Sequence, residues 1–417
     1  MIPSTSLTRI CKLIVCALAL LMKVCDTSNS EGTCSSETNA IDCQSGNQPD
    51  ENRYAESSNS EERWTRYREL IQEASKHVVS CLGCDCYSYL IQDDLDLFDR
   101  ISLEDVNKAQ SVAKQAVRYQ IIQGKVYRSP NCLFPMRCLG IDHFLKGLAP
   151  KLDHDIELMI NTHDWPFIHR RFEKDPLPLF SFSKTKEYYD ISFPAWTFWA
   201  GGPAISLYPR GIGRWDLLRE NLLKTAQTWP WEAKKEFAFF RGSRTSAERD
   251  NLILLSRTRP DLIDAQYTKN QAWKSRQDTL DAEPAEEVSF EDHCQYRYLF
   301  NFRGVAASFR FKHLFLCGSL VFHVGQEWIE FFYPAMIPWY HYIPVASDAS
   351  QEDLTDLLQF ARDNPDIAQR IARQGQEFVE QNLRMKDIEC YWEQLLRLYA
   401  LKLAFVPIKN EDLILVS

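Results

Sequence analysis

The sequence lacks several features that would each define a class of protein. Beyond the first 25 residues, no apolar run approaches the roughly 20 residues of a membrane-spanning helix. Basic residues are not in excess, since 48 Lys and Arg face 57 Asp and Glu, and this balance argues against a nucleic-acid partner. No segment recurs at a fixed period, as it would in a solenoid. What remains is a globular protein, and its 417 residues are enough for two domains.

The sequence also has no Asn-x-Ser/Thr site for N-glycosylation, although its start is typical of a secreted protein. Arg9 and Lys12 stand before and at the start of an apolar run at residues 13–22. This run is too short for a membrane anchor, so we predict a signal peptide at residues 1–25 and no stable membrane insertion after its cleavage. Residues 26–62 contain few large apolar side chains and are predicted to be a flexible acidic and polar leader.

Cysteines, in contrast, are plentiful: thirteen in all, of which ten follow the predicted signal peptide. An even number in an oxidising compartment indicates disulfides. The cluster Cys81, Cys84 and Cys86 could in isolation be a redox or zinc site, but behind a signal peptide we interpret it as structural bridges. Cys132 and Cys138 are close enough in sequence to close a compact loop. Such a loop serves either as a ledge for a partner or as a structural staple.

Residues 237–256 form the clearest candidate binding site. They predict a buried aromatic strand, a tight turn and a helix, with Thr245 and Glu248 matching a capping box. Sheets of this kind bind anions where a strand leads into a helix, because free N–H groups and the positive helix end lie there. Three arginines add forked donors that suit phosphate oxygens: Arg241, Arg244 and Arg249. The alternative interpretation is an exposed basic turn that pairs with nearby acids.

A strand–helix–strand unit follows at residues 296–324. It predicts strands at 296–302 and 320–324 around a helix at 309–316, which Gly318 ends. This is the pattern of a Rossmann-like βαβ unit. Arg310 lies in the first turn of the predicted helix, which is again a position suited to phosphate.

The first half of the chain contains a candidate base. Residues 156–161 predict a strand, and Asp164 lies just past its carboxyl end. A carboxylate at this point can accept a proton from a bound hydroxyl, although it could equally only cap a turn before Pro166. A base in one Rossmann-like half and arginines in the other indicate a nucleotide-sugar transferase. Its arginines, in place of a metal, would stabilise the departing diphosphate.

Simpler patterns account for much of the rest. Helical spacing occurs at 64–79 and 103–117, two strands with a tight turn are predicted at 119–127, residues 265–285 are polar and irregular, and two or three helices are predicted at 351–400.

Four motifs resemble those of the protein O-glucosyltransferases of the Rumi type, and the similarity runs from about Tyr67 to Tyr399. The motifs are Phe240-Arg-Gly-Ser-Arg-Thr-Ser246, Tyr267-Thr-Lys-Asn-Gln-Ala-Trp-Lys-Ser275, Tyr298-Leu-Phe-Asn-Phe-Arg-Gly-Val-Ala-Ala-Ser-Phe-Arg-Phe-Lys312 and Pro194-Ala-Trp-Thr-Phe-Trp199. The resemblance implies an α/β protein with the GT-B glycosyltransferase fold, in which two Rossmann-like domains face a cleft. We expect an acceptor-binding domain at 63–225, a UDP-sugar-binding domain at 226–385, and a final helix and tail at 386–417 that return to the first domain.

The resemblance also implies an activity. Members of this family transfer glucose from UDP-glucose, and in some cases xylose from UDP-xylose, to serine in the C-x-S-x-[PA]-C motif of folded EGF-like repeats such as those of Notch. The anomeric centre is inverted, and we expect neither a cofactor nor a divalent metal. We also expect the protein to be a monomer.

Roles for individual residues follow by position. The resemblance makes Asp164 the catalytic base and Arg310 the residue that neutralises the diphosphate. With Arg241 from the basic turn, the expected UDP-sugar contacts are Tyr208, Arg241, Ser243, Arg249, Val305, Ala306, Ala307, Ser308, Phe309 and Arg310. The expected acceptor contacts are Leu133, Phe134, Pro135, Met136, Arg137, Ala204, Ile205, Ser206, Leu207, Tyr208 and Pro209. The implied disulfides are Cys81–Cys86, Cys84–Cys390, Cys132–Cys138 and Cys294–Cys317.

The chain departs from the family near its last residues. Members commonly end in a KDEL-like retrieval signal, whereas here Asn410-Glu-Asp-Leu413 is followed by four further residues. We expect the lumen of the endoplasmic reticulum, with secretion as the alternative. Three other functions stay open: a xylosyltransferase, an inactive chaperone that binds EGF-like repeats, and a thiol oxidoreductase that uses Cys81 and Cys84.

Overall fold

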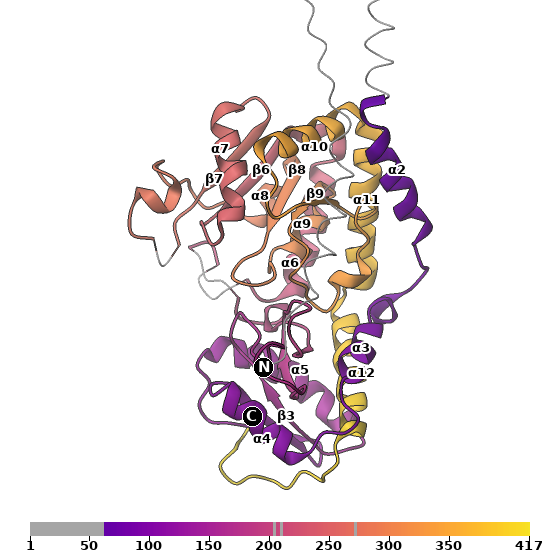
Figure 1. Ribbon diagram of the computed structural model, residues 1–417, viewed down its shortest axis with the longest axis vertical. Coiled ribbons are helices and arrows are strands. Elements are labelled where there is room, and N and C mark those ends of the chain that lie inside the picture. Colours follow the sequence, from indigo (N-terminus) through magenta and orange to yellow (C-terminus); the bar gives the residue numbers. More distant parts are fainter. Residues whose placement is uncertain (1–61, 203–205, 209–211, 271–272) are drawn as a thin grey trace, which may run out of the picture. The chain divides into compact units, whose positions relative to one another are not determined.

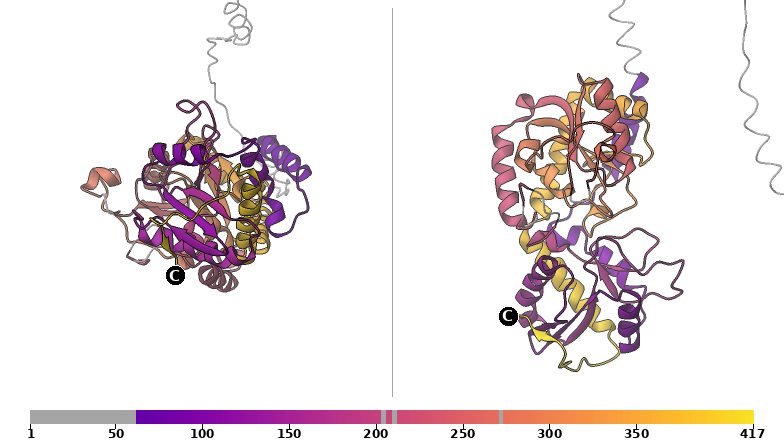
Figure 2. Two further views of the ribbon diagram at one scale, coloured as in Figure 1. Left: turned by 90° about the horizontal axis from the view of Figure 1, so that it is seen from below. Right: turned by 90° about the vertical axis from the view of Figure 1, so that its left-hand side faces the viewer.

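The computed structural model describes residues 62–202, 206–208, 212–270 and 273–417, which all belong to one compact unit (Figures 1 and 2). The predicted signal peptide and all but the last residue of the predicted leader lie outside these residues, as do Ala204, Ile205 and Pro209. The domain boundaries expected from the sequence stay a prediction. No helix in the described part of the chain is long and apolar enough to cross a membrane.

The first sheet has six strands in the order β11-β2-β1-β3-β4-β5. Their bounds are β1 Val117–Ile122, β2 Lys125–Arg128, β3 Ile156–Ile160, β4 Leu179–Ser181, β5 Ile191–Ser192 and β11 Ile414–Leu415. β3, β4 and β5 run parallel, whereas β1 is antiparallel to both β2 and β3. The first half of the chain is therefore only partly Rossmann-like. The predicted tight turn at Gln123 and Gly124 accounts for this, since so short a turn can join only antiparallel strands. Both turn residues have positive φ angles, 49° and 73°.

The second sheet has five strands in the order β10-β9-β8-β6-β7, and all of its pairings are parallel. The bounds are β6 Lys235–Gly242, β7 Ile263–Tyr267, β8 Tyr296–Phe302, β9 Leu320–Val324 and β10 Ile343–Val345. β6, β8 and β9 confirm predicted strands, and Gly318 ends the intervening helix with a φ of +64°. The interpretation of residue 265 onward as irregular was wrong for β7. This edge strand alternates buried and more exposed residues, so it has no long apolar run.

Helices cover both sheets. Their bounds are α2 Thr65–Lys76, α3 Tyr89–Leu95, α4 Leu103–Val112, α5 Pro135–Leu148, α6 Trp215–Thr228, α7 Asp250–Thr258, α8 Phe290–His293, α9 Phe311–Leu316, α10 Gln351–Asp363, α11 Pro365–Asn382 and α12 Met385–Lys402. The helix predicted at 103–117 ends earlier, because Val117 begins β1. The predicted cap at Thr245 was wrong. Ser246 accepts from the N–H of Glu248, and a short 3-10 turn, Ala247–Arg249, precedes α7.

Segments far apart in sequence lie side by side at two places. Figure 1 shows α2 beside α11, and Arg68 of α2 donates to Asn364, directly before α11, at 2.9 Å. At the other end of the chain, α12 packs on α3 and α5, and β11 pairs with β2 (Figure 2). The first sheet is thus completed by the last residues of the chain.

Four disulfide bridges join described residues, and they are the four pairs that the resemblance implies: Cys81–Cys86, Cys84–Cys390, Cys132–Cys138 and Cys294–Cys317. Cys84–Cys390 ties α12 to the segment before α3. Cys132–Cys138 differs from the expected simple loop, because α5 already begins at Pro135 and the bridge closes over its first turn.

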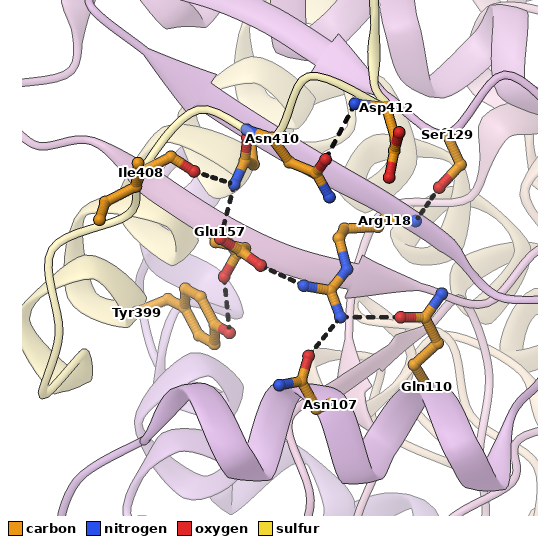
Figure 3. A network of polar contacts seen from close by, with 10 residues as sticks. Asn107, Gln110, Arg118, Ser129, Glu157, Tyr399, Ile408, Asn410 and Asp412 are labelled. Atoms are coloured by element: carbon orange, nitrogen blue, oxygen red, sulfur yellow. Dashed lines mark hydrogen bonds and ion pairs between the residues drawn. The ribbon is translucent and has the colours of Figure 1, made fainter.

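A buried polar network connects the first sheet to α4 and to the tail (Figure 3). Its centre is the ion pair between Arg118 on β1 and Glu157 on β3. The side chain of Gln120 donates to Glu157 at 2.7 Å and to the carbonyl of Ile408 at 2.9 Å. Further members are Asn107 and Gln110 of α4, which accept from Arg118, and Asn410, whose N–H donates to Gln120. Every charge in this network has a partner of opposite sign or a hydrogen bond.

Candidate active site

A cavity of about 720 Å³ opens at the carboxyl ends of strands from both sheets. Residues that follow β3, β4, β6, β7 and β8 line it, and this is where open α/β sheets hold their ligands. The lining includes Asp164 and Phe182 from the first sheet, and Gly242, Ser243, Thr268, Lys269, Asn270 and Gly304 to Arg310 from the second. A partly parallel sheet and a wholly parallel sheet, with strand ends at a common cavity, confirm the predicted α/β fold class of the GT-B type.

The structure brings most of the predicted site residues together. All ten expected UDP-sugar contacts line the cavity, and so does Asp164. Of the expected acceptor contacts, Arg137, Ser206 and Tyr208 line it, whereas Leu133, Phe134, Pro135, Met136 and Leu207 are not among its lining residues. Leu133, Met136 and Leu207 are each 41% to 50% exposed.

Two of the arginines carry charge that no carboxylate balances. Arg249 is buried, with Nη1 donating to the carbonyl of Ser243 and Nη2 to that of Arg303 at 2.5 Å. Arg310 directly precedes α9 and donates from Nη1 to the carbonyl of Arg241 at 2.6 Å. Among the described residues, neither guanidinium has a carboxylate within ion-pair distance, and Nε of Arg249 has no partner at all.

Burial lowers the pKa of both of these guanidinium groups. It lowers the pKa of Arg249 to about 9, with the nearby charge of Arg310 as the next contribution, and it lowers the pKa of Arg310 to about 10. Two like charges held together in a low-dielectric site are unfavourable until an anion arrives. The cavity wall therefore carries positive charge that suits an anionic ligand.

The other two arginines of the basic turn pair with carboxylates of the protein. Nη2 of Arg241 lies 2.6 Å from Asp264 on β7, and Arg244 forms two bonds with Asp250 at 2.9 and 2.5 Å. The interpretation as a basic turn that pairs with nearby acids is confirmed for two of its arginines, and the phosphate-binding interpretation stays a prediction. Arg241 and Arg244 pair with nearby acids, and Arg249 does not.

The backbone before α9 adds further donors. The N–H groups of Val305, Ala306 and Ser308 have no acceptor among the described residues, and all three residues line the cavity. Free N–H groups beside positive side chains form an anion-binding concavity.

Ser206 and Tyr208 line the cavity and contact residues that precede β8. The N–H of Ser206 donates to Glu287 at 2.9 Å. The hydroxyl of Tyr208 accepts from the N–H of Phe290 at 3.1 Å, and the two rings stack with centroids 5.6 Å apart. Burial raises the pKa of Tyr208 to about 12, so the phenol stays neutral. These contacts hold Ser206 and Tyr208 at the cavity.

The candidate base stands on the opposite wall. Asp164 follows β3, its side chain is 31% exposed, and Oδ1 lies 3.0 Å from Nη1 of Arg137 on α5. No described residue donates a hydrogen bond to Oδ2. One carboxylate oxygen is therefore held, and the other is left for an incoming donor.

Sequence reasoning missed several residues that line the cavity. Thr268, Lys269 and Asn270 belong to a motif that carried the resemblance, so their neighbourhood was visible. His293 had no such signal. Its Nδ1 lies 2.7 Å from the carbonyl of Ser289 and must carry the proton, while Nε2 has no partner among the described residues. Burial lowers the pKa of His293 to about 3, so the ring is neutral.

No group of three or more His, Cys, Asp or Glu side chains within the described ranges is arranged to hold a metal ion.

Comparison with known proteins assigns the family. The model of glycosyl transferase family 90 matches residues 80–417. This chain belongs to glycosyl transferase family 90. A family 90 relative from Aedes aegypti, named O-glucosyltransferase rumi homolog, is 55% identical over 83% of this chain and 86% of its own length. Protein O-glucosyltransferase 1 of Mus musculus is 52% identical over 84% of this chain and 89% of its own.

Similarity to solved structures is much weaker. Anabaena Alr3699/HepE in complex with UDP-glucose covers 42% of this chain and 52% of its own at 11% identity and a TM-score of 0.31, which is too low to support a conclusion. Family 90 membership makes this chain a glycosyltransferase.

Proposed function

We propose that this chain is an inverting protein O-glucosyltransferase. It moves glucose from UDP-glucose to serine in the C-x-S-x-[PA]-C motif of folded EGF-like repeats, such as those of Notch. The observation that carries this proposal is one cavity with a half-exposed carboxylate, Asp164, on one wall and the unpaired arginines Arg249 and Arg310 on the other. The names of the relatives support the same reaction.

The geometry suggests how the reaction proceeds. Oδ2 of Asp164 accepts the proton of the serine hydroxyl while the serine oxygen forms a bond to C1 of glucose. The bond from C1 to the β-phosphate oxygen breaks, and its electron pair leaves with UDP. Arg249, Arg310 and the free N–H groups before α9 stabilise the charge that develops on this diphosphate. Attack from the face opposite UDP inverts the anomeric centre.

Two consequences belong to the proposal. Fixed arginines perform the task that a divalent metal performs in other transferases, so transfer should proceed without one. The acceptor is a folded, disulfide-bonded domain, so the enzyme works in the secretory pathway, in the lumen of the endoplasmic reticulum. We also propose that it is a monomer.

Transfer to a single folded EGF-like repeat bearing C-x-S-x-P-C tests the proposal. UDP-glucose and UDP-xylose are offered separately in EDTA, and intact mass is measured. We expect one added hexose, no addition when the serine is replaced by alanine, and little addition to the reduced and alkylated repeat. A pentose added at the same serine would name UDP-xylose as the donor. No addition with either donor, even after magnesium or manganese is supplied, would favour a chaperone that only binds the repeat.

A further inference from the structure

Arg137 is oriented differently from the residues around it in the expected acceptor-binding segment. Leu133, Pro135 and Met136 are exposed, whereas only 16% of the Arg137 side chain is exposed. The guanidinium lies over two rings, 4.2 Å from the centroid of Phe134 and 4.7 Å from that of Trp196. Arg137 therefore turns inward, toward the cavity wall and away from the exposed ledge.

Its donor atoms are directed at the candidate base and at the loop that carries it. Nη1 lies 3.0 Å from Oδ1 of Asp164 and donates to the carbonyl of Thr162 at 2.7 Å. One guanidinium thus fixes both the carboxylate and the backbone two residues before it. The disulfide Cys132–Cys138 encloses Arg137 and limits how far it can move.

We propose that Arg137 is a positioning residue for Asp164 rather than a contact to the acceptor. The ion pair occupies Oδ1 and leaves Oδ2 for the serine hydroxyl. Holding the base in one orientation removes the need to order it when the acceptor arrives. This inference rests on the proposed function, in which Asp164 is the base.

The test separates kcat from KM. Arg137→Gln should lower kcat roughly 10²-fold, because the base loses its orientation, while KM for the folded repeat and KM for UDP-glucose stay within about threefold. Arg137→Lys, which keeps the charge but loses the planar fork, should recover part of the lost kcat. Arg170→Gln is the matched control, since Arg170 also lies over a ring, Tyr189 at 4.1 Å, but is not a cavity residue. It should match the wild type.

A rise in KM for the repeat with kcat unchanged would overturn the proposal and make Arg137 an acceptor contact. Equal kcat in Arg137→Gln and wild type would overturn it as well. Combining Arg137→Gln with Asp164→Asn should give a rate no lower than that of Asp164→Asn alone, because one residue acts through the other.

A measurement without turnover keeps the inference separate from the proposed function. Thermal unfolding of the two single variants and the double variant should show a loss in Tm for the double that is smaller than the sum of the two single losses. Additive losses would overturn the contact itself. If wild type transfers no sugar while the Tm losses are non-additive, the proposed function fails and the pairing stands.

Discussion

Largely buried arginines lie on the first sheet and beside the second, and their charge is paired with a carboxylate in one region and not in the other. In the first sheet, Arg118 meets Glu157, and α4 and the tail satisfy the remaining donors (Figure 3). Beside the second sheet, the acceptors of Arg249 and Arg310 among the described residues are backbone carbonyls and the hydroxyl of Thr245, and none is a carboxylate. The side chain of Arg118 is 12% exposed and Arg249 is 6% exposed, so the exposed fraction does not explain the difference between these two arginines.

We interpret the difference as a division between charge that stabilises the fold and charge that would bind a ligand. A buried ion pair whose hydrogen bonds are complete is a closed unit, and removing one partner exposes the whole desolvation penalty of the other. Buried arginines without a counter-ion make the fold less stable, and a diphosphate would offset that effect. The same substitution should therefore change stability in the first region and ligand affinity in the second.

The largest effect is expected for a carboxylate at the cavity. Asp164→Asn should lower the transfer rate roughly 10³-fold, because the serine loses its base, while UDP affinity stays unchanged. Initial rates and calorimetric titration with UDP measure the two quantities. Glu157→Gln is the matched control in the first sheet and should keep UDP affinity while it loses stability. Turnover near the wild-type level in Asp164→Asn would remove Asp164 from the mechanism.

Next in size is the effect of an unpaired arginine. Arg310→Gln should weaken UDP binding about 10²-fold, since it removes a charge-assisted bond to phosphate. The Tm of the ligand-free protein should stay equal or rise, because a buried charge without a counter-ion is gone. A titration and a melting curve on the same sample give both values. A fall in Tm with unchanged UDP affinity would place Arg310 with the structural arginines.

The reverse result is expected for the paired arginine. Arg118→Gln should lower the free energy of unfolding by about 3–5 kcal/mol, because Glu157 is left buried without its partner. UDP affinity should change less than about twofold. Urea unfolding measures the stability of this variant, and calorimetric titration measures its affinity for UDP. Weakened UDP binding in a folded Arg118→Gln protein would contradict the distinction between an arginine that stabilises the fold and arginines that bind UDP.

Acid should act mainly through the second region. Burial lowers the pKa of His293 to about 3, of His323 to about 3 and of His341 to about 4. The unfolded chain protonates these rings below pH ~6.5, so the stability present above that pH is lost as the pH falls toward the folded values. Each histidine contributes about 1.4 kcal/mol per pH unit within this window.

Urea unfolding at pH 7 and pH 5 measures this loss. His341→Gln should make the pH dependence shallower, since an amide does not titrate. Equal stability at both pH values would mean that these rings are not buried in the neutral form.

The smallest effect is expected for an arginine of the same turn that has a partner. Arg244→Gln breaks a half-exposed pair with Asp250, so the free energy of unfolding should fall by less than about 1 kcal/mol. UDP affinity should stay within about threefold of wild type. A loss of UDP affinity as large as that of Arg310→Gln would show that any positive charge near the cavity contributes to UDP binding, whether or not it is paired.

Much of the second sheet could be predicted from sequence because its central strands are rich in aromatic and aliphatic residues. β8 and β9 and the helix between them appeared at nearly their true bounds. β7 was missed because an edge strand alternates polar and apolar residues within a polar stretch. The start of α5 at Pro135 was missed because the cysteines suggested a loop there.

The candidate site could be predicted where the local sequence pattern determines the position of a residue. It could not be predicted where the partner of a side chain is distant in sequence. Asp164 was found from its place after a strand, and Arg249 and Arg310 from their places beside helix starts. The ion pair between Arg241 and Asp264 could not be predicted, because Asp264 lies on a neighbouring strand. The inward turn of Arg137 likewise depends on Trp196, which is distant in sequence.

Comparison of UDP with uridine tests the central claim most directly. The cavity is claimed to bind the diphosphate through charge that has no partner in the protein. Calorimetric titration of the wild-type protein in EDTA should give a dissociation constant for uridine at least roughly 10²-fold weaker than that for UDP, and Arg310→Gln should narrow this gap. Uridine that binds as tightly as UDP would contradict the account, because the arginines would then contribute nothing to the ligand.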